Sequence, residues 1–311
     1  MTGVASTRNP GRLLAVLALV GAWSSWGAPA GEAVSASGQA PPRGPLALTY
    51  VANSGVLVGA GETRVLIDAL FDKPNPEYRA PASEALDAML KGAPPYDGVD
   101  VVLVTHDHPD HFDPSLAVRY LERVEGPRLV APADAVEKMR AVASDWARIA
   151  PRVVSLDLPV GGKAERAVGP VTLTAFRTLH GQQDSPMNLM YLVDLGDWRV
   201  FHEGDSPGVP EEPATFRREE TRVDLALVHF WFPLNPDCAR FLQEVLRPDH
   251  IALTHLPVGL EGDAPGKIDM VRKYYRDIFL LVPGTPARTF EGSARNGVVP
   301  TPGHAPVPPR G

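Results

Sequence analysis

The sequence predicts an α/β fold, because short apolar segments typical of buried strands are interspersed with segments of helical composition. Strand-like segments come first, helices and strands follow in the middle, and helix and strand alternate toward the end. Of 311 residues, 44% are hydrophobic and 22% are charged, which is the composition of a globular domain with a substantial core. Periodicity alone predicts this mixture and no particular architecture.

Residues 1–30 have the pattern of a secretory signal peptide. Arg8 and Arg12 precede an apolar run over 13–21, and the small residues at 28–30 provide a cleavage site. The run is shorter than the roughly 20 residues of a membrane span, so we expect export to the periplasm or the medium without stable membrane insertion. An uncleaved anchor and a disordered tail on a cytosolic protein are the alternatives.

The chain after this leader divides into three parts. Residues 31–45 are rich in Gly, Ala, Ser and Pro and predict a flexible linker, 46–291 form the domain, and 292–311 predict a disordered tail. Loss of residues 1–30 removes two arginines and no acidic residue, so the net charge of −7 becomes about −9. An acidic chain is poorly suited to nucleic acid, and the expected partner is a small-molecule substrate. Cys238 is the single cysteine, which excludes an internal disulfide.

Four segments predict helices. Gly92 is a natural stop for the first of them. Asp113 can cap the second, which has Pro114 at its first position. The predicted helices span 82–91, 114–124, 133–149 and 237–246.

Short apolar segments bounded by Gly, Pro and polar residues predict the strands. The turn at 59–62 joins two of them in a hairpin or meander, and Gly196-Asp197 is the turn of a second hairpin. The predicted strands span 46–51, 55–59, 64–67, 101–104, 128–131, 153–156, 171–176, 188–193, 198–202, 224–229 and 250–254.

The stretch 105–111 indicates a metal site. His106, His108, Asp110 and His111 fall within six positions, directly after an apolar run. Imidazole suits zinc and the late first-row metals, and a carboxylate adds charge. Residues two apart in an extended chain point the same way, and sites in layered α/β proteins lie at the carboxyl ends of strands. A polar loop with chance histidines is the alternative.

The pattern His106-x-His108-x-Asp110-His111 resembles the signature of the metallo-β-lactamase superfamily. Further matches to that family follow in the same order and extend the resemblance over residues 46 to 260. The resemblance implies a four-layer αββα sandwich, in which helices cover two packed sheets. The further matches are an early Asp after a strand, a His after a later strand, an Asp in a Gly-Asp turn and a last His: Asp68, His180, Asp205 and His255.

The resemblance also implies two divalent metal ions, with zinc as the first expectation and manganese or iron as alternatives. Asp110 and Asp205 are the expected catalytic carboxylates, beside a water that the ions activate. The implied reaction is hydrolysis of an ester, lactone, thioester, amide or phosphodiester. The implied ligands are a three-nitrogen set, a second mixed set and a bridging carboxylate: His106, His108 and His180; Asp110, His111 and His255; and Asp205.

Asp205 distinguishes branches of the family. True β-lactamases of this fold have Cys or Ser at that point, whereas general hydrolases, lactonases and phosphodiesterases keep the Asp, so β-lactam hydrolysis is less favoured. Segment 52–58 is loosely similar to the branch that includes ascorbate-6-phosphate lactonase. A metal-retaining binding protein without catalysis, a nuclease and a diiron oxidoreductase are competing hypotheses for the function. The sequence predicts neither the substrate nor the oligomeric state.

Several residues outside the implied ligand set have more than one interpretation. Asp68 is expected to brace the metal-binding loop. His202 could support the site or be a hydrogen-bonded core residue. His229 could donate a proton to the leaving group, with the aromatic residues 230–232 as pocket walls, or it could belong to a packed apolar corner. The expected specificity loops are 72–100, 181–187 and 206–222.

Overall fold

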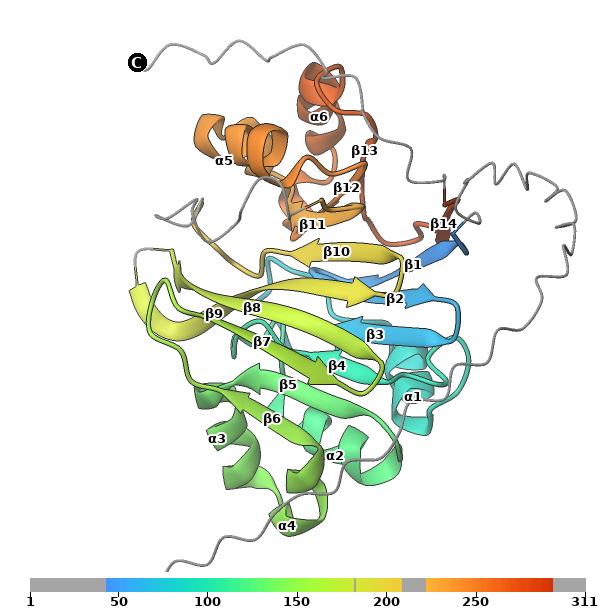
Figure 1. Ribbon diagram of the computed structural model, residues 1–311, viewed down its shortest axis with the longest axis vertical. Helices are drawn as coiled ribbons and strands as arrows, with labels where there is room; N and C mark the ends of the chain where they lie inside the picture. The colour runs from blue at the N-terminus through green and yellow to red at the C-terminus, as the bar shows by residue number, and fades with distance from the viewer. Residues whose placement is uncertain (1–42, 182, 209–221, 293–311) are drawn as a thin grey trace, which may run out of the picture. The chain divides into compact units, whose positions relative to one another are not determined.

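The computed structural model describes residues 43–181, 183–208 and 222–292 (Figure 1). The predicted signal peptide, most of the predicted linker and nearly all of the predicted tail lie outside them. Within the described residues, two seven-stranded sheets pack face to face, and helices cover their outer faces. The predicted α/β class and the four-layer αββα architecture are therefore confirmed.

The first sheet mixes antiparallel and parallel strands. From one edge, three antiparallel pairings are followed by three parallel pairings. The parallel strands all end at the same edge of the sheet. In order across the sheet, the strands are β14 (Arg288–Phe290), β1 (Leu46–Ala52), β2 (Gly55–Ala60), β3 (Thr63–Ile67), β4 (Val101–Leu103), β5 (Arg128–Pro132) and β6 (Val153–Leu156).

The second sheet repeats this series of pairings. Three antiparallel pairings again precede three parallel ones. The two sheets differ in where the antiparallel edge strand lies in the sequence. In the first sheet this strand is β14, the last strand of the chain, whereas in the second sheet it precedes the other six strands in sequence. In order, the strands are β7 (Lys163–Val168), β8 (Val171–His180), β9 (Gln183–Leu195), β10 (Trp198–His202), β11 (Leu225–His229), β12 (His250–Thr254) and β13 (Ile278–Leu280).

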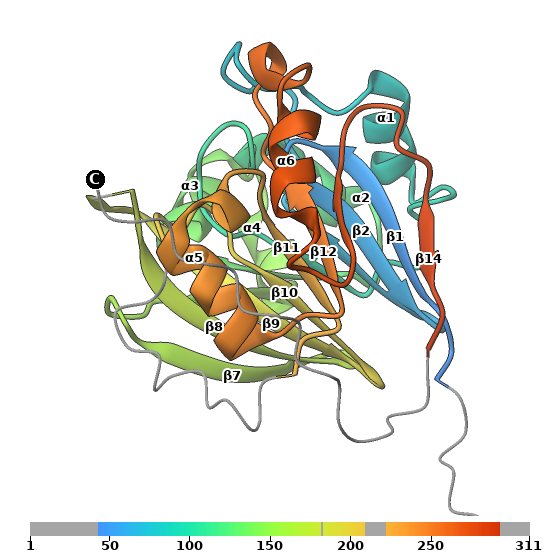
Figure 2. The same ribbon diagram turned by 90° about the horizontal axis from the view of Figure 1, so that it is seen from above.

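Helices pack on the outer face of each sheet (Figures 1 and 2). The cap predicted at Asp113 is present, because its carboxylate accepts the Leu116 N–H at 2.7 Å. No helix among the described residues has the length and apolar character to cross a membrane. On the first sheet lie α1 (Ser83–Lys91), α2 (Pro114–Arg123), α3 (Ala133–Val142) and α4 (Trp146–Ile149), and on the second α5 (Pro236–Arg240) and α6 (Ala264–Arg272).

The central strands bury both faces, which places the segments that follow them deep in the fold. In β4, Val101 and Leu103 face the core between the sheets, and Val102 faces the helices. Because both faces of β4 are buried, every residue of this strand is apolar, as in other strands that are covered on both sides. The histidine-rich segment after β4 therefore starts at the seam between the two sheets.

The predicted elements agree with the structure except at a few places. The helix predicted over 133–149 is divided into α3 and α4, because Ala143 is extended and Ser144 and Asp145 disfavour helix interiors. The helix predicted over 237–246 is α5 followed by a π-helical turn over Phe241–Leu246. Strands β7, β13 and β14 and helix α6 were not predicted. Half of the residues of β7 are charged, and β13 and β14 have three residues each.

Candidate metal centre

Strand ends of both sheets meet at a cluster of histidines and aspartates. β4 leads into the segment 105–111, β8 ends at His180, and Asp205 and His255 follow β10 and β12. The structure brings all seven predicted ligands together there. The ligand atoms of each group lie within 4.8 Å of one another: His106, His108, His180 and Asp205, and separately Asp110, His111 and His255.

The first group has three imidazoles around one carboxylate oxygen. Asp205 Oδ2 lies 3.6 Å from His106 Nε2 and 3.4 Å from His180 Nε2. The His108 ring is 4.4 Å from the His180 ring, centroid to centroid. His106 is fully buried, whereas His108 and His180 are only partly buried. This group is therefore open to solvent on the side of His108 and His180.

The second group also contacts Asp205. Asp110 Oδ2 is 3.5 Å from His111 Nε2 and 3.2 Å from His255 Nε2. Asp205 Oδ1 is 3.2 Å from His111 Nε2, and Asp205 Oδ2 is 3.3 Å from His255 Nε2. Asp205 therefore contacts ligand nitrogens of both groups.

These separations fit divalent cations. Two nitrogens bound to a tetrahedral zinc ion at about 2.0–2.1 Å lie about 3.3 Å from each other. The nitrogen–carboxylate separations from Asp205 are 3.2–3.6 Å. His106 Nε2 is buried and has no hydrogen-bond partner in the described part of the chain. A buried, unpaired nitrogen directed at a carboxylate is what a metal ligand requires.

Asp68 orients two of the histidines from behind. Its Oδ1 accepts the Thr105 N–H at 2.8 Å, and its Oδ2 accepts the Thr105 hydroxyl at 2.6 Å and the His111 Nδ1–H at 2.9 Å. Thr105 Oγ1 lies 3.0 Å from His106 Nδ1 and can accept its proton. Both rings then present Nε2 to the cluster, and these contacts agree with the bracing role predicted for Asp68.

The backbone is constrained around the second group. Asn53, Asp68 and His255 have φ values of 48°, 44° and 56°, which are uncommon for residues other than Gly. Asn53 Nδ2 donates to Asp110 O at 3.1 Å and to Asp110 Oδ2 at 3.0 Å, and Asn53 O accepts the His255 N–H at 3.2 Å. Asn53 was not predicted, although an Asn before Ser-Gly between two strands is typical of a tight turn.

The turn that carries Asp205 depends on Gly204. Gly204 has a φ of +63°, and a Cβ there would lie 2.5 Å from Asn188 Oδ1. Asn188 Oδ1 accepts the Asp205 N–H at 3.0 Å, and His202 Nδ1 accepts the Gly204 N–H at 3.1 Å. His202 is buried, and its Nε2 donates to Ser54 O at 3.2 Å. His202 is therefore a hydrogen-bonded core residue, and it contacts the turn that carries Asp205.

His229 lies inside the cluster. Its Nε2 is 2.9 Å from Asp205 Oδ1, and its ring is 4.4 Å from that of His255. Behind it, Glu203 Oε1 accepts the backbone N–H of His229. Sequence reasoning missed Glu203, for which the available signal was a carboxylate directly after an apolar strand.

The neighbouring aromatic residues divide between the site and the core. Tyr78 packs edge-on against His255, with ring centroids 4.4 Å apart, and Trp231 lies 5.5 Å from His229. Phe230 and Phe232 are buried in the apolar cluster beneath α5 and α6. Phe230 and Phe232 thus belong to a packed apolar corner, whereas Trp231 and Tyr78, the latter from the predicted loop 72–100, contact histidines of the cluster.

The cluster has strongly shifted pKa values. Burial, followed by the charge of His111, holds the pKa of His106 well below its ordinary value. Burial alone would raise the pKa of Asp205, but the histidines around it, His111 first, hold it well below its usual range. Burial also opposes charge on His111, yet Asp205 and Asp110 raise its pKa well above the ordinary value. The carboxylates therefore favour cations, and a metal ion would compete with protons there.

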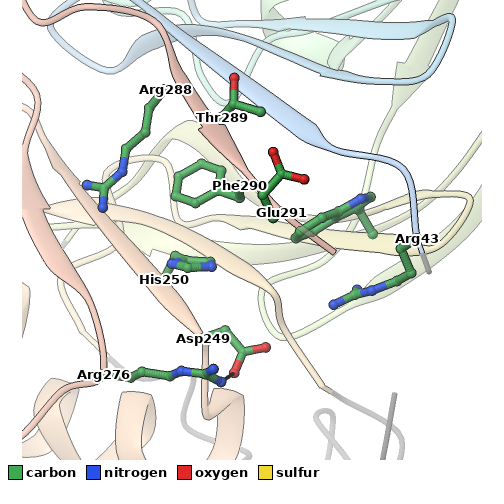
Figure 3. Close-up of a pocket in the computed structure, with 9 residues that line it drawn as sticks. Arg43, Asp249, His250, Arg276, Arg288, Thr289, Phe290 and Glu291 are labelled. Carbon is green, nitrogen blue, oxygen red and sulfur yellow. Dashed lines mark hydrogen bonds and ion pairs between the residues drawn. The ribbon is translucent and has the colours of Figure 1, made fainter. Parts of the chain in front are cut away.

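A pocket of about 240 Å³ lies away from the cluster, at the amino ends of β10 and β12 (Figure 3). Its charged side chains are balanced locally, as Arg276 pairs with Asp249 at 2.8 Å and Arg288 with Asp277 at 2.9 Å. His250 lines this pocket and lies 2.8 Å from Asp277. His250 is therefore no part of the metal centre.

Comparisons with known proteins agree with the geometry. A family model described as "Beta-lactamase superfamily domain" matches residues 63–265, a range that contains all seven predicted ligands. A UPF0173 metal-dependent hydrolase of Nitratidesulfovibrio vulgaris (Hildenborough) is 28% identical over 215 residues, which cover 67% of this chain and 79% of that protein.

Two further proteins extend the comparison. A UPF0173 protein of Pyrococcus abyssi is 30% identical over 135 residues, which cover 42% of this chain and 52% of that protein. The match thus spans about half the length of that relative. The metallo-β-lactamase fold protein YhfI from Bacillus subtilis superimposes with a TM-score of 0.54 at 16% identity, covering 80% of this chain and 100% of that one. This likeness concerns the fold.

Proposed function

This chain belongs to the β-lactamase superfamily as a metal-dependent hydrolase, and we propose that it binds two divalent cations on either side of Asp205. The substrate is a small molecule with an ester, lactone or phosphodiester bond. Zinc is the first expectation for the metal, and manganese or iron with the same ligands are the alternatives.

The proposal rests on one observation, the contact of Asp205 with both groups of ligands. Its Oδ2 lies near His106 and His180 of the first group and also near His255 of the second, and its Oδ1 lies near His111 of the second. A carboxylate shared by two ligand groups in this way would suit a pair of cations.

The residues of the site have different roles in the proposed reaction. When bound, a pair of cations would supply Lewis-acid polarisation and lower the pKa of an attacking water. Asp205 and Asp110, the predicted catalytic carboxylates, have lowered pKa values and stay ionised, so they hold cations at neutral pH. His108 and His180 are partly exposed and would be accessible to a substrate, and Tyr78 and Trp231 pack against His255 and His229.

A substrate panel tests the reaction. The metal-loaded protein is assayed on a phosphodiester, a lactone, a thioester, an aryl ester and a cephalosporin. The comparison is between Asp205→Ala and Asp107→Asn, because Asp107 lies in the same loop but pairs with Lys138 at 2.5 Å instead of joining the cluster. We expect one substrate class to be hydrolysed, with turnover lost in the first variant and kept in the second.

The remaining outcomes distinguish the competing functions. Cephalosporin hydrolysis alone would favour a β-lactamase. Two bound metals without turnover of any substrate would favour a metal-retaining binding protein. A protein that binds no metal, or an Asp205→Ala variant with full turnover, would refute the proposal.

We also propose that the protein is exported. The support is the basic start, short apolar run and small-residue site in residues 1–30, which lie outside the described residues. N-terminal sequencing of protein from the periplasmic fraction or the medium should give a start near residue 31. An intact Met1 in the cytosolic fraction would contradict export.

A further inference from the structure

We propose that His229 is an additional ligand of the second metal position through its Nε2, and that the buried Glu203 orients its ring. The inference rests on the proposed function, because it requires that cations bind around Asp205. It adds His229 to the seven predicted ligands and assigns Glu203, which sequence reasoning left without a role, as a positioning residue.

The position of the His229 ring is that of a ligand. Nε2 lies 2.9 Å from Asp205 Oδ1, and the ligand atoms of Asp205, His229 and His255 all lie within 4.8 Å of one another. His229 is 5% exposed, so bulk water is largely excluded from the ring. The same carboxylate oxygen is 3.2 Å from His111 Nε2. His229 therefore shares the Asp205 carboxylate with the second group and lies beside its His255.

Glu203 is placed to support that orientation. The residue is 1% exposed, and its Oε1 accepts the His229 backbone N–H. The same oxygen lies 3.4 Å from His229 Nδ1, a buried nitrogen that has no hydrogen-bond partner among the described residues. Glu203 Oε2 is buried and likewise has no hydrogen-bond partner among the described residues. A buried carboxylate without full compensation is costly, whereas one behind a metal-bound imidazole is favourable. A cation bound to Nε2, on the far side of the His229 ring, would offset the cost of burying the Glu203 carboxylate.

The two sheets present this arrangement twice. In the first sheet, Asp68 directly follows β3, and its carboxylate contacts Nδ1 of His111, which follows the neighbouring parallel strand β4. In the second sheet, Glu203 directly follows β10, and its carboxylate faces Nδ1 of His229, at the end of the neighbouring parallel strand β11. The sheets share one series of pairings, and each carboxylate accepts a backbone N–H from the end of the neighbouring strand, so Glu203 occupies the place of Asp68 and His229 that of Thr105, which directly precedes the predicted ligand His106.

An additional ligand makes the two metal positions unequal. The first position has three imidazoles and the shared carboxylate, which suits four-coordinate zinc. The second would exceed that number, so it should prefer a cation that accepts five or six ligands, such as manganese or ferrous iron. Its ligands would be Asp110, His111, Asp205, His229 and His255.

Cobalt(II) binding to the full chain tests the inference without an activity readout. Visible d–d absorption distinguishes four-coordinate cobalt from cobalt with five or six ligands. The wild-type protein should bind two Co²⁺ with one spectrum of each kind. His229→Gln should weaken the second ion by more than about 100-fold and remove the high-coordination spectrum, and Glu203→Gln should weaken it by about 10–100-fold. His250→Gln is the matched control and should change neither.

The outcomes are separable from those of the proposed function. A wild-type chain that binds fewer than two Co²⁺ overturns both. Two Co²⁺ with unchanged affinity and spectrum in His229→Gln overturn this inference alone. If His229→Gln does not fold, ¹¹³Cd-loaded, ¹⁵N-histidine-labelled wild-type protein decides by the number of imidazoles coupled to cadmium. Six coupled rings support the inference and five overturn it, the six being His106, His108, His111, His180, His229 and His255.

Discussion

Replacement of Asp68 by Asn should separate the metal-binding role of its carboxylate from its structural role. Oδ2 of Asp68 accepts two protons, from Thr105 Oγ1 at 2.6 Å and from His111 Nδ1 at 2.9 Å, at a fully buried position. An amide nitrogen there accepts neither. A hydrogen bond to a charged group contributes about 1.5–3 kcal/mol, so loss of both sets an upper bound of about 3–6 kcal/mol on the destabilisation.

Structural relaxation in the Asp68→Asn variant should make the loss of folding stability smaller than this upper bound and should weaken metal binding instead. The Thr105 hydroxyl can rotate to accept from the new amide, and His111 can shift its proton from Nδ1 to Nε2. That second change removes the lone pair that His111 offers to a cation. We therefore expect a destabilisation of about 2–3 kcal/mol, together with a 10–100-fold weaker second metal, which corresponds to about 1.4–2.7 kcal/mol.

Urea unfolding of the metal-free protein measures the first quantity and competitive metal titration the second. Asp224→Asn is the matched control, because this buried carboxylate accepts from Arg43 at 2.8 Å and from the Arg199 N–H at 2.8 Å, at the amino end of β11. The control should lose stability and keep both metal affinities. An Asp68→Asn protein with wild-type affinity for the second metal would refute the reasoning.

Two further predictions concern the turn and the pH dependence. Gly204→Ala should lower the folding stability by about 2–4 kcal/mol and displace Asp205, because the new Cβ lies at a left-handed backbone position and clashes with Asn188. Full stability and metal affinity in this variant would contradict the assigned geometry. Burial opposes charge on His255, yet Asp205 and Asp110 raise its pKa to about 8 in the metal-free fold. Because the folded pKa exceeds the unfolded value of about 6.5, this stabilisation of about 2 kcal/mol is complete below pH 6.5 and is lost as the pH rises through 8. Urea unfolding in chelator from pH 6 to 9 should show that fall, and a stability that rises across this window would exclude it.

The ligand set was predictable because its signals are local. Three histidines and an aspartate within six positions after an apolar run need no tertiary knowledge, and Asp68 and Asp205 follow strands while His180 ends one. Strand ends converge at sheet edges, so residues at such ends can be expected to meet.

The supporting contacts were not predictable, since they join segments that are distant in sequence. Asn53 lies 57 positions from Asp110, and Glu203 lies 26 positions from His229. Their residue types also occur in ordinary turns and loops. The short segments β13 and β14 are strands because they pair with β12 and β1, and their sequences alone carry no strand pattern.

The repeated series of pairings has a consequence for the assembly of the molecule. The chain up to β6 supplies two ligands to each cation position, and the chain from β7 onward supplies the rest. A cut between β6 and β7 would give two fragments, neither of which can complete a coordination sphere, and β14 would have to return from the second fragment to pair with β1. Reassembly of such fragments should depend on the concentration of cation, which would then act as a reversible crosslink between the halves of a single fold.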